Sequence, residues 1–127
     1  MPAKLLIVED QADIRRLIRW ALEDDEYEIQ EAANGTAGLE KILSWQPDMV
    51  LLDTMMPGGM DGLEVCRQVR AAPGTAKTVI VMLTAKAGSA DHEAARTAGA
   101  DYFLPKPFSP AKLSELLGAL LKHKAGP

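Results

Sequence analysis

Short apolar runs alternate along the chain with segments in which apolar residues recur every three or four positions. The first run, KLLIVE, has the length of a strand, and Ile14, Leu17 and Ile18 then recur at helical spacing over about residues 11–24. The same alternation repeats along the rest of the chain. The pattern predicts five strands, at 4–9, 27–32, 48–53, 78–83 and 101–104, each followed by a helix.

The ends of the predicted helices carry local signals. Asn34-Gly35 predicts a turn before the second helix, which is expected to stop near Trp45, ahead of Pro47. Ser109 is the expected N-cap of the last helix, with Pro110 at its first position. The fourth helix, predicted from 88 to 98, has an apolar face made mostly of alanine. We therefore expect it to be weakly anchored.

Strands that alternate with helices indicate an α/β fold with a parallel sheet covered by helices on both faces. The apolar run DMVLLD at 48–53 is typical of a central strand of such a sheet. The length of 127 residues suits one domain over 1–127, ordered from about 4 to 122, with a frayed tail at 123–127. Functional residues of these sheets follow the carboxyl ends of the strands, near the point where strand order reverses.

Composition excludes several classes of function. The net charge of -4 argues against direct nucleic-acid binding and against an acidic membrane surface. The apolar runs are far shorter than the roughly 20 residues that span a bilayer, and the N-terminus does not resemble a signal peptide. The single cysteine, Cys66, cannot form an internal disulfide. A cytoplasmic location is the simplest expectation.

Reactive side chains follow four of the five predicted strands. Glu9 and Asp10 follow the first, Asp53 ends the third, Thr84 follows the fourth, and Lys106 lies just beyond the fifth. These groups should converge at one edge of the sheet. Three adjacent carboxylates repel one another and stay ionised only beside a cation. Mg²⁺ suits such hard oxygen ligands, because it binds few protein groups and keeps several waters.

A site with Mg²⁺ and a lysine attracts phosphate. An aspartate within it can attack phosphorus and form an acyl phosphate, while the metal and Lys106 offset charge on the transferred oxygens. Thr84 can donate a hydrogen bond to one of those oxygens. Asp53 would then be held by a buried strand, and the irregular TMMPGGMDG segment at 54–62 would bring a backbone carbonyl to the metal.

In combination these motifs resemble the receiver domain of two-component response regulators, the family that includes the chemotaxis regulator CheY. The resemblance runs from the acidic pair in IVED, through Asp53 with its following MPG and DG, to Thr84-Ala85 and the Lys-Pro-Phe that begins at Lys106. It covers nearly the whole chain. It implies a flavodoxin-like sheet with strand order 2-1-3-4-5.

The resemblance also implies a role for each matching residue. Asp53 matches the phosphoacceptor, Asp10 a direct Mg²⁺ ligand, and Glu9 a ligand that acts through water. Met55 matches the position whose backbone carbonyl binds the metal, and Lys106 the lysine that pairs with the phosphoryl group. The bond between Lys106 and Pro107 matches a peptide that is cis in relatives.

Further positions match the conformational switch and the control of hydrolysis. Thr84 matches the switch hydroxyl, and Phe103 falls at the switch aromatic, where tyrosine is commoner. Met55 and Lys86 occupy two variable positions that tune hydrolysis in the family. Since methionine cannot orient an attacking water, slow autodephosphorylation is predicted. The segment MPGGMDG at 56–62 has one residue more than many relatives, so its loop conformation could differ.

The predicted function is therefore a receiver that takes a phosphoryl group from a histidine kinase or a histidine phosphotransfer protein. It would assist its own phosphorylation without being an enzyme for an external substrate. Its output would pass to a downstream protein, or to a second copy, through the face formed by the fourth helix, fifth strand and fifth helix. A further output domain and the oligomeric state stay open.

Three alternative functions predict different sequence features. A non-phosphorylated interaction module of the same fold would be expected to lack one of the key residues, and none is missing. An aspartyl-phosphate phosphatase would carry a D-x-D pattern after the first strand, where this chain has Glu9-Asp10-Gln11. A flavodoxin would carry a phosphate-binding loop rich in Ser, Thr and Gly at that place.

Overall fold

The computed structural model describes residues 2–56, 60–84 and 89–125, without the side chains of 89–92 and 123–125. Five parallel strands form one sheet in the order β2-β1-β3-β4-β5, as the resemblance implied. Neighbouring strands lie in continuous register, for example Leu52 of the third strand beside Met82 of the fourth. The strands are β1 Ala3–Val8, β2 Tyr27–Ala32, β3 Met49–Asp53, β4 Val79–Thr84 and β5 Tyr102–Pro105.

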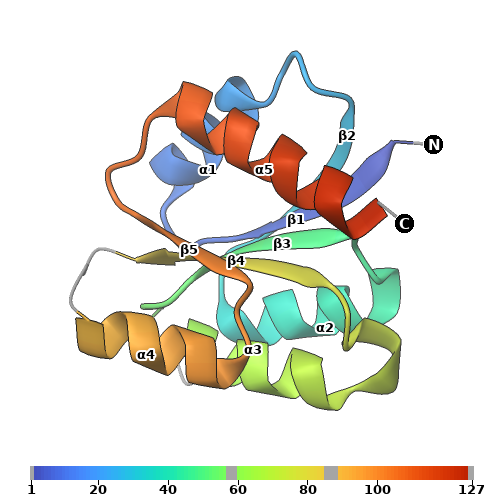
Figure 1. Cartoon of the computed structure of the whole chain (residues 1–127), viewed down its shortest axis with the longest axis vertical. Helices are drawn as coiled ribbons and strands as arrows, with labels where there is room; N and C mark the ends of the chain where they lie inside the picture. The colour runs from blue at the N-terminus through green and yellow to red at the C-terminus, as the bar shows by residue number, and fades with distance from the viewer. Residues whose placement is uncertain (1, 57–59, 85–88, 126–127) are drawn as a thin grey trace.

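Helices cover both faces of the sheet. Figure 1 shows α1 and α5 packed on one face and α2, α3 and α4 on the other. The helices are α1 Ala12–Ala21, α2 Gly35–Trp45, α3 Gly62–Ala71, α4 Ser89–Ala98 and α5 Pro110–Ala125. A short 3-10 turn at Pro73–Thr75, which the sequence pattern did not predict, follows α3.

The central strands are apolar throughout because they are buried on both sides. In β1, Leu6 and Val8 join the core beneath α2 and α3, whereas Leu5 and Ile7 join the core beneath α1 and α5. All five residues of β3 are buried, including Asp53. The fold therefore places a carboxylate at the end of a fully covered strand.

Side chains cap the starts of α2, α3 and α5. The Asn34 side chain accepts a hydrogen bond from the backbone N–H of Ala37, so the predicted Asn34-Gly35 turn is the start of α2 itself. Asp61 caps α3 in the same way. Ser109 Oγ accepts from Lys112 N, in agreement with its predicted capping of α5.

Two helix ends differ from the sequence expectation. α1 ends at Ala21, short of Asp24, because four acidic residues at 23–26 would lie at the negative end of the helix dipole. α5 instead continues to Ala125, beyond the expected end near residue 122. Lys122 lies near this end, where its charge suits a helix C-terminus.

Of the helices within the described residues, none combines the length and the apolar character that crossing a bilayer requires.

Candidate functional site

The three predicted acidic residues meet at the carboxyl ends of β1 and β3. Asp53 is the last residue of β3, and Glu9 and Asp10 directly follow β1. One carboxylate oxygen from each lies within 4.8 Å of the other two. Because the chain leaves β1 for β2 on one side and returns to β3 on the other, this is where the strand order reverses.

The acidic cluster is largely withdrawn from solvent. Glu9 is 0% exposed and Asp53 is 4% exposed, and Asp10 is partly buried. Carboxylates are almost never buried to this extent unless a positive group accompanies them. The arrangement therefore needs a compensating cation.

Lys106 supplies one positive charge. Its Nζ donates a hydrogen bond to Glu9 Oε1 at 2.7 Å and lies 3.5 Å from Asp53 Oδ1. The Lys106 backbone N–H also donates to the carbonyl of Thr84 at 2.7 Å, which fixes the segment after β5 beside the end of β4. The peptide between Lys106 and Pro107 is cis, as the resemblance implied.

One ammonium does not balance the cluster. Burial raises the pKa of Glu9 to about 7, outweighing the hydrogen bonds from Lys106 and from the Gln11 backbone, and the charge of Asp53 raises the pKa further. Within the described residues, Lys106 is the lysine that pairs with Glu9 and Asp53, and Asp10 lies beside these two carboxylates. This donor set fits a small hard cation such as Mg²⁺, which prefers carboxylate and carbonyl oxygens.

The segment after β3 is tied back to the sheet by its backbone. Thr54 donates from its N–H to the carbonyl of Leu83 at 3.0 Å, and Gly62 donates to the carbonyl of Thr54 at 3.2 Å. Met55 N donates to Asp53 Oδ1 at 3.2 Å, while the Met55 side chain is 64% exposed. The carboxylate of Asp53 is therefore oriented by its own loop as well as by the strand.

Gly62 is required for this close return of the chain. A Cβ at Gly62 would lie 2.1 Å from the carbonyl oxygen of Asp53 and 2.9 Å from the Cα of Thr54. Both neighbours are backbone atoms, so they cannot move aside cheaply. The Asp-Gly pair quoted in the family motif thus serves two purposes, because Asp61 caps α3 and Gly62 packs against the site.

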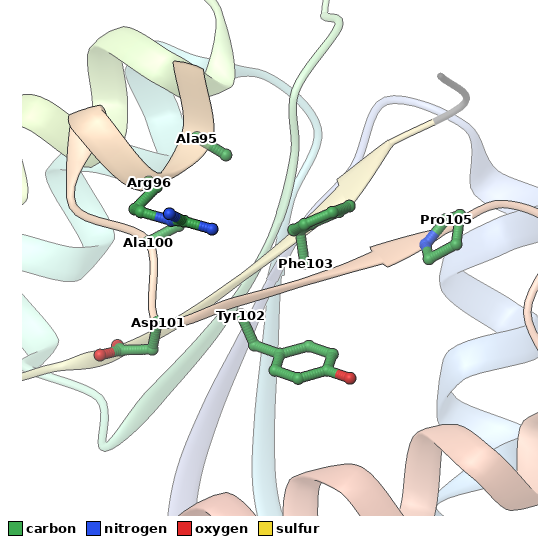
Figure 2. Close-up of a pocket in the computed structure, with 7 residues that line it drawn as sticks. All are labelled: Ala95, Arg96, Ala100, Asp101, Tyr102, Phe103 and Pro105. Atoms are coloured by element: carbon green, nitrogen blue, oxygen red, sulfur yellow. The ribbon is translucent and has the colours of Figure 1, made fainter. Parts of the chain in front are cut away.

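The two predicted switch residues lie on β4 and β5. Thr84 ends β4 and is 5% exposed. Phe103 is partly buried against the core beneath α2, α3 and α4. Figure 2 shows the Phe103 and Tyr102 side chains on opposite sides of β5, and Tyr102 is 47% exposed. Of the two neighbouring aromatics, Phe103 is therefore the one that faces the core.

A cavity of about 500 Å³ lies beside Phe103. It separates the end of α4 from β5, and Figure 2 shows the seven side chains around it. They are Ala95, Arg96, Ala100, Asp101, Tyr102, Phe103 and Pro105. The cavity falls on the surface that the resemblance implied for output.

The structure brings Glu9, Asp10, Asp53 and Lys106 into one cluster, as predicted. Lys86 and residues 57–59 of the MPGGMDG segment lie outside the described residues. Sequence reasoning missed Arg15, which donates a hydrogen bond to the backbone carbonyl of Glu9 at 2.7 Å. No spacing signal marks it, because the contact depends on how α1 rotates against β1.

Comparison with known proteins identifies the class that this fold and cluster define. The response regulator receiver domain matches residues 5–118, and the chain belongs to that family. Among curated relatives, it is 46% identical over 120 residues to the transcriptional regulatory protein ResD of Bacillus subtilis, covering 94% of this chain and 48% of ResD. It is 40% identical over 123 residues to the response regulator MprA of Mycolicibacterium vanbaalenii, covering 97% of this chain and 52% of MprA.

Solved structures agree with this assignment. The chemotaxis protein CheY4 of Vibrio cholerae superimposes with a TM-score of 0.87 at 33% identity, covering 94% of this chain and 98% of that one. A putative response regulator from Chloroflexus aurantiacus gives a TM-score of 0.89 at 35% identity, covering 95% and 98%. The chain spans about half the length of the curated relatives it matches.

Proposed function

We propose that this domain accepts a phosphoryl group on Asp53 from a histidine kinase or a histidine phosphotransfer protein, in a Mg²⁺-dependent reaction. The observation that carries the proposal is the buried pair of Glu9 and Asp53, which Lys106 faces from the segment after β5. Membership of the receiver family supports it. Among the described residues, this cluster is the group of carboxylates that could hold a metal ion.

Asp53 acts as the nucleophile in this proposal. One of its carboxylate oxygens forms a bond to phosphorus as the bond between phosphorus and the donor's imidazole nitrogen breaks. Met55 N and Lys106 Nζ both face Asp53 Oδ1, at 3.2 and 3.5 Å, which leaves its other oxygen as the attacking atom. The rigid strand behind Asp53 fixes the direction of attack.

The remaining residues hold the metal and the transferred group. Asp10, Asp53 and the carbonyl of Met55 would hold Mg²⁺ directly, and Glu9 would do so through water. When bound, Mg²⁺ supplies positive charge to the phosphoryl oxygens. Lys106 pairs with one of those oxygens once its contact with Glu9 is released, and the hydroxyl of Thr84 donates to another.

Phosphorylation then shifts the equilibrium between two conformations. Thr84 would move toward the phosphoryl group and Phe103 would change its packing. The supporting observation is the shallow anchoring of this region, where β5 has four residues and the described buried residues of α4 are Ala95 and Ala98. The changed surface of α4, β5 and α5 would be recognised by a downstream protein or by a second copy.

The domain promotes its own phosphorylation and reverses it slowly, without acting on an external substrate. Slow reversal follows from Met55, whose exposed thioether cannot orient a water for attack. Lys86 is the second residue proposed to tune this step. A phosphoryl half-life of minutes or longer is expected, and a half-life of seconds would contradict the assignment.

Intact mass after incubation with acetyl phosphate and Mg²⁺ tests the central proposal. One added phosphoryl group is expected in the wild type, and none in Asp53→Asn or in the presence of a chelator. Asp13→Asn, which changes an exposed carboxylate of α1, is the matched control and should still be modified. No mass gain in any folded sample would favour the alternative, a non-phosphorylated interaction module of the same fold.

A further inference from the structure

Arg15 connects the acidic cluster to the edge of the sheet. It lies on α1 with a side chain that is 20% exposed. Its Nη1 donates to the backbone carbonyl of Glu9 at 2.7 Å, and its Nε donates to Glu31 Oε1 at 2.9 Å. Because the guanidinium is planar and rigid, the two contacts fix each other's direction.

Glu31 is itself held from two sides. This residue of the edge strand β2 accepts from Arg15 through one carboxylate oxygen and from Arg19 through the other. Arg19 Nη2 also donates to the backbone carbonyl of Ile29 at 3.3 Å. The Glu31 carboxylate is therefore held in one orientation as an acceptor for Arg15, whereas a fully exposed carboxylate would be free to rotate.

The backbone of Glu9 is constrained at both of its polar groups. Its N–H donates to the carbonyl of Ala32 at 3.0 Å, and its carbonyl accepts from Arg15. The carbonyl of Glu9 belongs to the peptide that leads into Asp10. Rotation of that peptide would swing the Asp10 carboxylate away from Glu9 and Asp53, with which it forms the cluster.

We propose that Arg15 is a positioning residue of the cation site, which holds the peptide between Glu9 and Asp10 so that both carboxylates face Asp53. The inference rests on the proposed Mg²⁺-dependent function. Arg15 touches the backbone of a proposed ligand and none of the reacting atoms. Glu31 and Arg19 support Arg15 from the side of β2 and act one step further away.

The sign of the effect on metal affinity separates positioning from simple electrostatics. A guanidinium beside an acidic cluster repels a bound cation, so charge alone predicts that removing Arg15 tightens Mg²⁺ binding. Loss of positioning predicts the opposite, because partners that orient metal ligands typically contribute about tenfold to a hundredfold in affinity. The direction of the change in Mg²⁺ affinity therefore distinguishes positioning by Arg15 from the effect of its charge.

The Mg²⁺ dissociation constant of the full chain, followed by NMR through the backbone amides of residues 9–11, tests the proposal. Arg15→Ala should raise this constant by about tenfold. Arg19→Ala removes the same charge from the same helix but leaves the carbonyl of Glu9 bonded, and should change the constant by less than about twofold. Arg15→Lys keeps the charge but loses the planar guanidinium that donates to both Glu9 and Glu31. It should therefore weaken Mg²⁺ binding to an intermediate degree.

The controls separate failure of this inference from failure of the proposed function. Each variant is titrated well below its own unfolding temperature, with its amide spectrum confirming the fold, and again at higher salt to remove the contribution of charge. Wild-type binding with an equal or lower constant in Arg15→Ala overturns the positioning role alone. Absence of Mg²⁺ binding in the wild type overturns the proposed function, and this inference with it.

Discussion

The carboxyl ends of β1 and β3 and the edge strand β5 belong to the same sheet, yet they are anchored differently. Around Glu9 and Asp53, the strands are buried on both faces and the loops are tied by backbone hydrogen bonds to Ala32 and Leu83. β5 has four residues, of which only Leu104 is buried. Its neighbour α4 presents alanines to the core, at Ala95 and Ala98.

This difference matches the separate demands of reaction and response. A nucleophile and metal ligands act best when their geometry is fixed before the reaction. A region that reports the reaction has to move, and movement is cheap where little apolar surface is uncovered. The interaction of Lys106 N–H with the Thr84 carbonyl lies where the two regions meet.

The largest predicted effect comes from filling the space beside Asp53. Gly62→Ala would place a Cβ 2.1 Å from a backbone oxygen, so it should lower the free energy of unfolding by about 3 kcal/mol or more, at the upper end of overpacking costs. Gly118→Ala is the matched control, because a Cβ there meets nothing within 4 Å. In that helix interior alanine should add about 0.5–1 kcal/mol.

Urea unfolding of both variants measures the two effects. If the chain around Asp53 is rigid, replacing glycine by alanine should lower the free energy of unfolding at Gly62 and raise it at Gly118. If Gly62→Ala were as stable as the wild type, the backbone after β3 would move to accept the added Cβ. The ends of β1 and β3 would then be no more rigid than β5.

Much of this contrast could be read from the sequence. The apolar runs at Leu5–Val8 and Val79–Leu83 predict buried parallel strands, because only a strand covered on both faces lacks polar alternation. Placing Glu9, Asp53 and Lys106 together needed only the rule that parallel strands end at the same edge. The alanine face of α4 indicated shallow anchoring in the same way.

The remaining features depend on geometry that no local pattern encodes. The contact between Arg15 and Glu31 joins residues from different elements and depends on the rotation of α1 over the sheet. The early end of α1 reflects charge at its C-terminus, which apolar periodicity does not register. Adjacent residues of a strand always point to opposite faces, but only the structure showed that Phe103, and not Tyr102, is the one that faces the core.

A smaller effect should appear in native-state hydrogen exchange. The amides of Leu51 and Leu52 lie in a central strand and should exchange only through global unfolding. The amides of Asp101 and Lys106, bonded to the carbonyls of Ile80 and Thr84, flank β5 and should exchange through local opening. Their protection should be lower by about tenfold or more, equivalent to about 1.4 kcal/mol.

Exchange measured at two pH values separates opening equilibria from intrinsic rates. Equal protection at both places would show that the sheet opens as one unit. In that case β5 would have no independent freedom, and the switch would need another moving element.

The smallest predicted effect concerns Glu31, on the other edge strand. Burial raises the pKa of Glu31, but hydrogen bonds and charges from Arg19 and Arg15 outweigh burial and hold the pKa below its ordinary value. A carboxyl with a lowered folded-state pKa adds stability above its ordinary pKa, and this is lost as pH falls through the folded-state value. Since the Glu31 side chain is 30% exposed, the contribution should stay below about 1 kcal/mol.

Glu31→Gln should therefore lower the free energy of unfolding slightly at neutral pH, and the difference should shrink as pH falls below about 4. Glu28→Gln removes a carboxylate from an exposed position of the same strand and is the matched control, which should leave the free energy of unfolding nearly unchanged. Urea unfolding across this pH range, at low and high salt, measures both variants. A large pH-independent loss in Glu31→Gln would mean that packing rather than charge ties β2 to α1. A small loss combined with weakened Mg²⁺ binding in Arg15→Ala would mean that these ion pairs contribute geometry to the site more than stability to the fold.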